Sequence, residues 1–199
     1  MLTGSKKLSQ IIQKTEIENL DLAPSNIGLV GFEKEFYNKS QGRELILKKK
    51  ILETSDYYDF IILDSPPALG PLTMNALSAS NSVLIPIQCE FFALEGVAQL
   101  LSTINLLRKQ VNPNLLIRGF LPTMFASQNN LSKQVMYDLS HHFNRYMIKN
   151  LSNSENIFIP RSVKLAESPS FGKPILLYDT KSIGNLAYQN LAEVILQGT

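Results

Sequence analysis

The sequence contains the run Phe60-Ile61-Ile62-Leu63-Asp64, followed by Ser65-Pro66-Pro67-Ala68-Leu69-Gly70, and this run is its most informative part. Four consecutive apolar residues that end in a carboxylate predict a strand buried on both faces of a parallel sheet. The Pro-Pro pair cannot continue the strand, so a loop is expected directly after it. At the carboxyl edge of such a sheet, Asp64 is placed to hold the water shell of a magnesium ion beside a nucleotide phosphate.

A phosphate-binding loop is missing from the sequence. Such a loop needs a Gly-rich turn with a Lys at a helix N-terminus, because backbone N–H groups must surround the phosphates. The only Gly-Lys pair is Gly172-Lys173, and there Glu167 replaces the first glycine and Pro174 replaces the required Ser or Thr. The sequence therefore offers a magnesium-type Asp64 without a cradle for the phosphates.

Bulk composition is that of a single globular domain. The chain has 199 residues, of which 44% are hydrophobic and 18% charged, so one domain over residues 1–199 is expected. The single cysteine, Cys89, rules out a disulfide framework and fits a reducing cytosol. No apolar run approaches the roughly 18–20 residues that a membrane-spanning helix needs, so no membrane contact is expected.

The net charge of +2 hides a gradient along the chain. Residues 1–107 hold nine basic and twelve acidic residues, whereas residues 108–181 hold ten basic and four acidic ones. A positive half indicates a polyanion partner, since Lys and Arg neutralise phosphates and release counterions. Scattered, solvated charge explains the same count equally well.

Helical and short buried-strand patterns alternate along the chain, which predicts an α/β domain with a mostly parallel sheet flanked by helices. Helices are expected at 8–12, from 26 onward, and at 42–54, 73–79, 90–110, 132–149 and 182–197. Strands are expected at 20–23, 60–64, 82–87, 115–121, 156–159 and 175–177.

Five segments match a known family in order. They are residues 59–70, residues 85–96 (Ile-Pro-Ile-Gln-Cys-Glu-Phe-Phe-Ala-Leu-Glu-Gly), residues 119–124 (Gly-Phe-Leu-Pro-Thr-Met), residues 159–174 (Ile-Pro-Arg-Ser-Val-Lys-Leu-Ala-Glu-Ser-Pro-Ser-Phe-Gly-Lys-Pro) and residues 178–182 (Tyr-Asp-Thr-Lys-Ser). From about Leu20 to Leu196, the chain resembles the ParA/Soj chromosome- and plasmid-partition ATPases. The resemblance implies a P-loop-NTPase-like fold of the ParA/MinD type.

In that family, a Walker A segment with its phosphate loop precedes the part that resembles this chain. The resemblance therefore implies an N-terminally truncated protein that lacks the first strands of the sheet and cannot bind or hydrolyse ATP alone. A start assigned to an internal Met, a truncated gene product and a natural short form all remain open.

The resemblance also implies roles for single residues. Asp64 would be the catalytic Walker B carboxylate that contacts magnesium through water. The switch loop would contain Pro66, Pro67 and Gly70. The residues that would flank the adenine of ATP are Thr123, Met124, Pro160 and Arg161. The residues that would contact DNA are Arg161, Lys164, Lys173 and Lys181. One departure from the family is the neutral loop at 126–129, where many relatives carry an Arg.

The cofactors and partners implied for a complete family member are ATP, Mg²⁺, non-specific double-stranded DNA, a ParB-type partner and a second copy in a homodimer. The expected location is the cytoplasm, on the nucleoid. The closing helix at 183–197 contains no Lys or Arg, unlike the basic membrane-binding helix of MinD-type relatives. Two alternatives stay open: a nucleotide-independent module that binds DNA or a partner, and a metabolic enzyme of the same broad fold.

Overall fold

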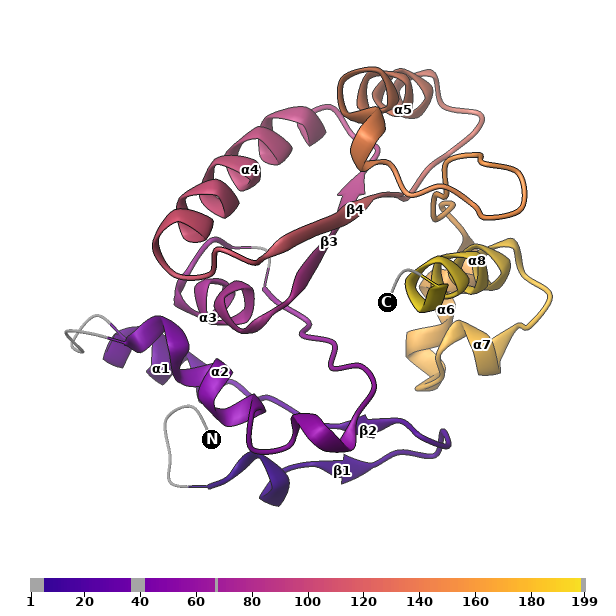
Figure 1. The fold of residues 1–199 in the computed structure, drawn as a ribbon. Coiled ribbons are helices and arrows are strands. Elements are labelled where there is room, and N and C mark those ends of the chain that lie inside the picture. The colour runs from indigo at the N-terminus through magenta and orange to yellow at the C-terminus, as the bar shows by residue number, and fades with distance from the viewer. Residues whose placement is uncertain (1–5, 37–41, 67, 198–199) are drawn as a thin grey trace. The chain divides into compact units, whose positions relative to one another are not determined.

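The computed structural model describes residues 6–36, 42–66 and 68–197 (Figure 1). The chain divides into two compact units. The first unit is formed by Met1–Ser82 with Ser102–Leu116, and the second by Val83–Leu101 with Ile117–Thr199.

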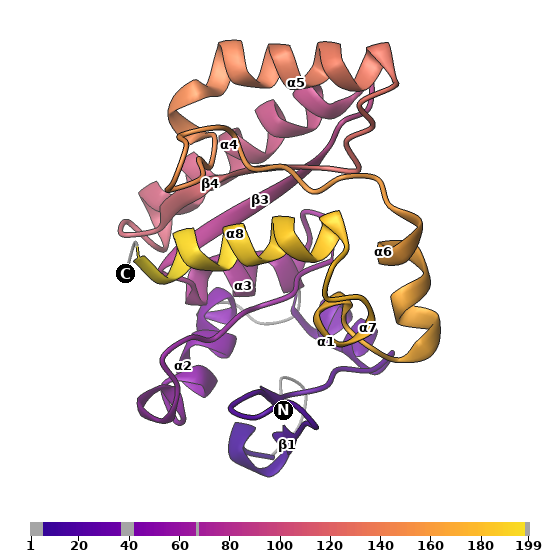
Figure 2. The same ribbon diagram turned by 90° about the vertical axis from the view of Figure 1, so that its right-hand side faces the viewer.

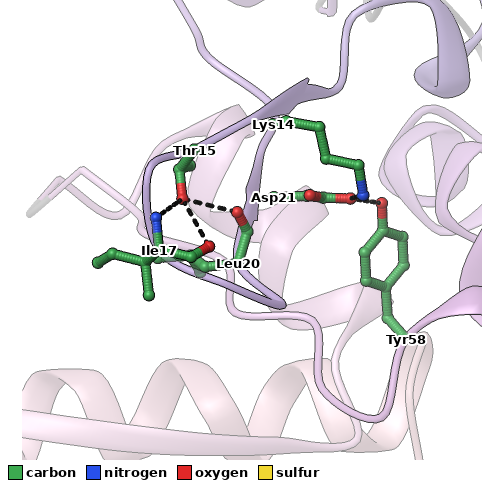
Figure 3. A network of polar contacts seen from close by, with 6 residues as sticks. All are labelled: Lys14, Thr15, Ile17, Leu20, Asp21 and Tyr58. Atoms are coloured by element: carbon green, nitrogen blue, oxygen red, sulfur yellow. Dashed lines mark hydrogen bonds and ion pairs between the residues drawn. The ribbon is translucent and has the colours of Figure 1, made fainter.

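A short hairpin opens the first unit. After a 3-10 turn at Leu8–Gln10, strands β1 (Gln13–Lys14) and β2 (Asp21–Leu22) pair antiparallel. Figure 3 shows the polar contacts that hold it: the Lys14 Nζ lies 2.9 Å from the Asp21 Oδ2, to which the Tyr58 hydroxyl also donates at 2.8 Å. The strand predicted at 20–23 is confirmed, shortened to two residues.

Three helices follow in the first unit. They are α1 (Leu29–Phe36), α2 (Ile46–Ile51, after a 3-10 turn at Arg43–Leu45) and α3 (Pro71–Ala79). The fully buried Asn75 of α3 ties α2 to α3, since its Oδ1 accepts from the Leu47 N–H at 3.1 Å. Its Nδ2 donates to the carbonyl oxygens of Arg43, at 3.0 Å, and Pro71, at 3.1 Å. The expected helices from 26 and at 42–54 are confirmed in shorter form, and the one expected at 73–79 is confirmed and begins two residues earlier, at Pro71.

The buried strand predicted at 60–64 is wrong. Residues 60–66 are in neither a helix nor a strand, and Phe60, Ile61 and Ile62 are 41%, 41% and 89% exposed. Within the described residues no strand pairs with this segment, so its backbone groups have no ladder to join and its side chains no second layer to enter. The loop predicted after Asp64 is present at Ser65, Pro66 and residues 68–70, and Pro67 lies outside the described residues.

Two parallel strands form the sheet of the second unit. They are β3 (Ser82–Gln88) and β4 (Leu116–Thr123). The Leu116 N–H donates to the Asn81 carbonyl at 2.9 Å and, further along both strands, the Cys89 N–H donates to the Thr123 carbonyl at 3.0 Å. Between these two bonds both strands advance in the same direction, so they run parallel, as their mostly apolar sequences predict.

Helices cover both faces of this strand pair. Successive β4 side chains point to opposite faces. Phe120 therefore packs on Phe143 and Tyr146, with ring centroids 5.4 and 5.2 Å away, while Leu121 joins a core cluster with Leu191 of α8. Figure 2 shows α5 (Asn130–Phe143) on one side of the pair and α8 (Ile183–Gln197) on the other. Helix α4 spans Ala93–Gln110, so the predicted helices 90–110 and 182–197 are confirmed.

Three further expectations are corrected. The helix expected to reach 149 ends at Phe143 and a 3-10 turn (Asn144–Tyr146), because the Ile148 N–H bonds instead to the Phe120 carbonyl at 3.4 Å. Residues 156–159 form no strand: Asn156 makes an isolated bridge to Lys149, and Pro160, just beyond, makes one to Phe125. Residues 175–177 lie in a one-turn helix, α7 (Ile175–Tyr178). The carbonyl oxygen of Pro174 accepts a hydrogen bond from the Tyr178 N–H in this turn.

The segment between these bridges and α7 is helical too. It holds α6 (Val163–Glu167) and a 3-10 turn at Ser168–Phe171, which ends at Gly172 in the left-handed conformation, φ 63°. No helix or strand was expected in this stretch from its sequence.

Candidate nucleotide and polyanion sites

Asp64 lies on the exposed, irregular segment of the first unit. Among the described residues its carboxylate forms no hydrogen bond or ion pair. The loop that follows is anchored to α3, since the Thr73 hydroxyl lies 2.6 Å from the Ala68 carbonyl and 3.2 Å from that of Pro66. Gly70 is the N-cap of α3, so the described part of the predicted switch loop is coupled to the start of this helix.

The four residues predicted to flank the adenine come together in the second unit. Phe125 and Pro160 form a parallel bridge. The Phe125 N–H donates to the Ile159 carbonyl at 3.1 Å, and the Arg161 N–H donates to the Phe125 carbonyl at 2.8 Å. These bonds place Thr123-Met124 beside Pro160-Arg161, although the two pairs are separated by α5 in the sequence. Met124 has a positive φ of 55°, an unusual backbone conformation for a residue with a side chain.

A hollow of ≈ 700 Å³ opens where β3 ends. Most of its lining residues lie at the end of β3, the start of α4 or the start of α5, and these include Ile87, Cys89, Phe92, Val97 and Leu131. Arg161, which follows the bridge at Pro160, also lines it. Burial raises the pKa of the Cys89 thiol to about 11, so this thiol stays protonated at neutral pH. The size and apolar walls of the hollow are typical of small-molecule sites.

Arg161 is the cationic group of this hollow. Its guanidinium Nη2 lies 3.3 Å from the Glu90 Oε1, and both side chains are more than half exposed. An ion pair so exposed contributes little to stability, about 0–1 kcal/mol. Because the pair is weak, its carboxylate can be displaced by another anion.

Lys164, on α6, belongs to a polar cluster. Its Nζ lies 3.4 Å from the Glu167 Oε2 and 5.7 Å from the centroid of the Tyr178 ring. The Tyr178 hydroxyl donates to the same Glu167 oxygen at 3.1 Å. The hydrogen bond to Glu167, followed by the charge of that carboxylate, raises the pKa of Lys164, while desolvation and then the Glu167 bond raise the pKa of Tyr178.

Lys173 and Lys181 differ from Arg161 and Lys164 in their charged partners, since the latter two each form an ion pair with a Glu. Lys173 and Lys181 are exposed, and no ion pair of either occurs within the described part of the chain. The four predicted DNA contacts therefore lie in one unit, and two of them have a carboxylate partner among the described residues.

The described residues fit only part of a magnesium–nucleotide site. They contain no group of three or more His, Cys, Asp and Glu side chains that could hold a metal ion. A Mg²⁺ bound through a single carboxylate relies on phosphate oxygens and waters for its other ligands.

Sequence reasoning missed three features of these sites. Glu90 and the edge-to-face pair Phe91–Phe92 line the hollow, and their position directly after a buried parallel strand was an available signal. Glu167, the partner of Lys164, was noticed only as a mismatch to a phosphate loop. Its three-residue spacing from Lys164 on a short helix was the available signal.

No helix among the described residues combines the length and the apolar character required to cross a membrane.

Comparison with known proteins gives consistent results. A family model described as "AAA domain" matches residues 1–117. Sporulation initiation inhibitor protein Soj of Bacillus subtilis (strain 168) is 43% identical over 195 residues, covering 98% of this chain and 74% of the relative. Chromosome partitioning protein ParA of Myxococcus xanthus (strain DK1622) is 40% identical over 196 residues, covering 98% of this chain and 66% of the relative.

A solved structure is similar to this chain over almost its whole length. Cobyrinic acid a,c-diamide synthase from Mycobacterium smegmatis, with bound ADP and magnesium, matches with a TM-score of 0.79 and 32% identity. The match covers 98% of this chain and 69% of that one. The chain belongs to the ParA/Soj family of chromosome-partitioning ATPases and has their ParA/MinD-type, P-loop-NTPase-like α/β fold.

Proposed function

We propose that this chain carries the adenine-flanking and DNA-facing parts of a ParA/Soj-type partition ATPase, and that its 199 residues by themselves neither bind nor hydrolyse ATP. The observation that carries the proposal is the Phe125–Pro160 bridge, which aligns Thr123-Met124 with Pro160-Arg161 beside the hollow at the end of β3. The two units act as parts of one domain, residues 1–199.

In this account the adenine lies against Thr123-Met124 and Pro160-Arg161, and the backbone of these bridged segments fixes its orientation. Asp64 supplies one contact, through water, to Mg²⁺. The loop from Pro66 to Gly70, anchored to α3 by Thr73, responds to the terminal phosphate. Because the 199 residues offer no backbone cradle, they do not hold the phosphates themselves.

The partners proposed for the complete family protein are double-stranded DNA without sequence preference, a ParB-type regulator and a second copy of the chain. Support for DNA comes from the charge of residues 108–181 and from the exposure of Lys173 and Lys181. The proposed location is the cytoplasm, on the nucleoid.

Gel-shift titrations at several salt concentrations test the DNA part of this proposal. They use the protein expressed from its complete gene, with ATP and Mg²⁺. We expect affinity for all duplex sequences to fall steeply with salt, and Lys173→Ala or Lys181→Ala to flatten the slope by about one unit for each phosphate no longer neutralised. The DNA face is wrong if the quadruple Ala variant of Arg161, Lys164, Lys173 and Lys181 folds, dimerises and keeps wild-type affinity.

A second candidate is a nucleotide-independent module that binds DNA or a partner. The missing phosphate loop favours it. The same titrations separate the two candidates, because the module would bind DNA equally well with and without ATP.

A further inference from the structure

We infer that Glu167, held in place by Tyr178, is a positioning residue that restrains Lys164 and so lowers the affinity of this face for duplex DNA. The inference rests on the proposed function, because it names a device that tunes the proposed DNA contact. Glu167 and Tyr178 are not proposed to touch DNA themselves; they act through Lys164, which is one of the four proposed DNA contacts.

The geometry of the cluster supports the restraint. One carboxylate oxygen, Glu167 Oε2, accepts from two donors, the Lys164 Nζ at 3.4 Å and the Tyr178 hydroxyl at 3.1 Å. The Tyr178 ring also lies 5.7 Å from the Lys164 Nζ, within the range of a cation–π contact. Phe171 stacks on the same ring, with centroids 5.2 Å apart, which limits where the ring can move.

The ion pair needs this support. On a helix surface a Glu placed before a Lys is the better order, and here Lys164 precedes Glu167 by three residues. The pair is also about half exposed, 50% for Lys164 and 42% for Glu167, so alone it would be weak. The hydroxyl of Tyr178 fixes the carboxylate where it meets Lys164, and the ring offers the ammonium a second contact.

The restraint opposes DNA binding in a defined way. A phosphate that approaches Lys164 must displace Glu167 from the ammonium, and the carboxylate left nearby repels it. Neither cost arises at Lys173 or Lys181, for which no ion pair occurs among the described residues. Lys164 is therefore a conditional contact, released only when Glu167 is moved or neutralised.

Glu167→Gln tests this inference in the protein expressed from its complete gene, with ATP, Mg²⁺ and a short duplex of mixed sequence. We expect affinity at low salt to rise roughly two- to fivefold, the equivalent of one exposed ion pair. The plot of log affinity against log salt should become steeper by up to about 0.9, because Lys164 then neutralises one further phosphate. Tyr178→Phe, which removes only the hydroxyl, should raise affinity in the same direction by less.

Two controls separate a specific restraint from a general change in charge. In a Lys164→Ala background, Glu167→Gln should have no further effect, because no ammonium remains to be released. Glu193→Gln, the same charge change at an exposed position of α8, should leave the slope unchanged.

The inference is overturned if Glu167→Gln leaves wild-type affinity and slope unchanged, or if its higher affinity persists in the Lys164→Ala background. A wild-type protein that binds no duplex DNA while Glu167→Gln binds it supports the restraint. If neither binds, the proposed DNA function fails, and the restraint fails with it.

Discussion

The backbone N–H of Arg161 donates a hydrogen bond to the carbonyl oxygen of Phe125, with the two atoms 2.8 Å apart. This bond and its neighbour from Phe125 to Ile159 use only main-chain atoms. The segments proposed to flank the adenine are therefore held together independently of the Arg161 side chain, which is left to pair with Glu90 at the rim of the hollow.

Arg161→Ala should accordingly leave the fold intact. We expect the free energy of unfolding to change by less than about 0.5 kcal/mol, since the side chain is exposed and its ion pair weak. Ile159→Ala is the contrasting variant, because Ile159 is buried in the core cluster with Leu191 and its truncation should cost about 2–5 kcal/mol. Urea denaturation of both variants checks this, and equal losses would contradict it.

Asn75→Ala should destabilise the first unit. The change leaves the Leu47 N–H and the Arg43 carbonyl without their buried partner, at a cost of roughly 1–3 kcal/mol. Asn105→Ala, at an exposed position of α4, is the matched control and should change stability by less than about 0.5 kcal/mol. Chemical denaturation measures both; an Asn75→Ala as mild as its control would mean that the three bonds contribute nothing.

The hairpin network, formed by Lys14, Asp21 and Tyr58, should make the free energy of unfolding depend on pH in acid and in alkali. Hydrogen bonds from Lys14 and then Tyr58 lower the pKa of Asp21 from 3.8, so its contribution is present above that value and is lost as pH falls through the lowered pKa. The bond to Asp21 raises the pKa of Lys14 and of Tyr58. Their contributions are present below their ordinary values of 10.5 and 10.0 and are lost as pH rises through the raised ones.

Asp21→Asn tests this network. The variant should be less stable than wild type at neutral pH, and the difference should shrink in acid and in strong alkali. Thermal melts across the pH range measure it. A difference that stays constant with pH would show that Asp21 acts through its shape rather than its charge.

The parts of the fold that local pattern determines were predictable from sequence. The helix over Ala93–Gln110 has a regular apolar period, and β3 and β4 are short, mostly apolar segments that pair with each other inside this chain. The motif at 159–174 also predicted that Pro160 and Arg161 lie near Thr123 and Met124, and the Phe125–Pro160 bridge brings these two pairs together.

Elements that depend on a non-local partner were not predictable. Residues 60–64 have the sequence of a buried strand, but a strand forms only when a neighbour pairs with it, and the described residues provide none. Residues 175–177 have strand-like composition, but Pro174 begins a helical turn there. The sequence did not lead to the partner of Lys164. Glu167 stands at the position of a phosphate-loop glycine, but it also lies three residues after Lys164, and that spacing brings the two side chains together.

Calorimetric titration of the 199-residue chain with Mg-ATP measures whether these residues alone bind the nucleotide. Without a phosphate loop the chain lacks most charge-assisted phosphate contacts, each worth about 1.5–3 kcal/mol. We expect no measurable binding by a preparation whose thermal melt shows that it is folded, and no advantage of ATP over adenosine. Micromolar affinity for Mg-ATP, well above the affinity for adenosine, would contradict the account.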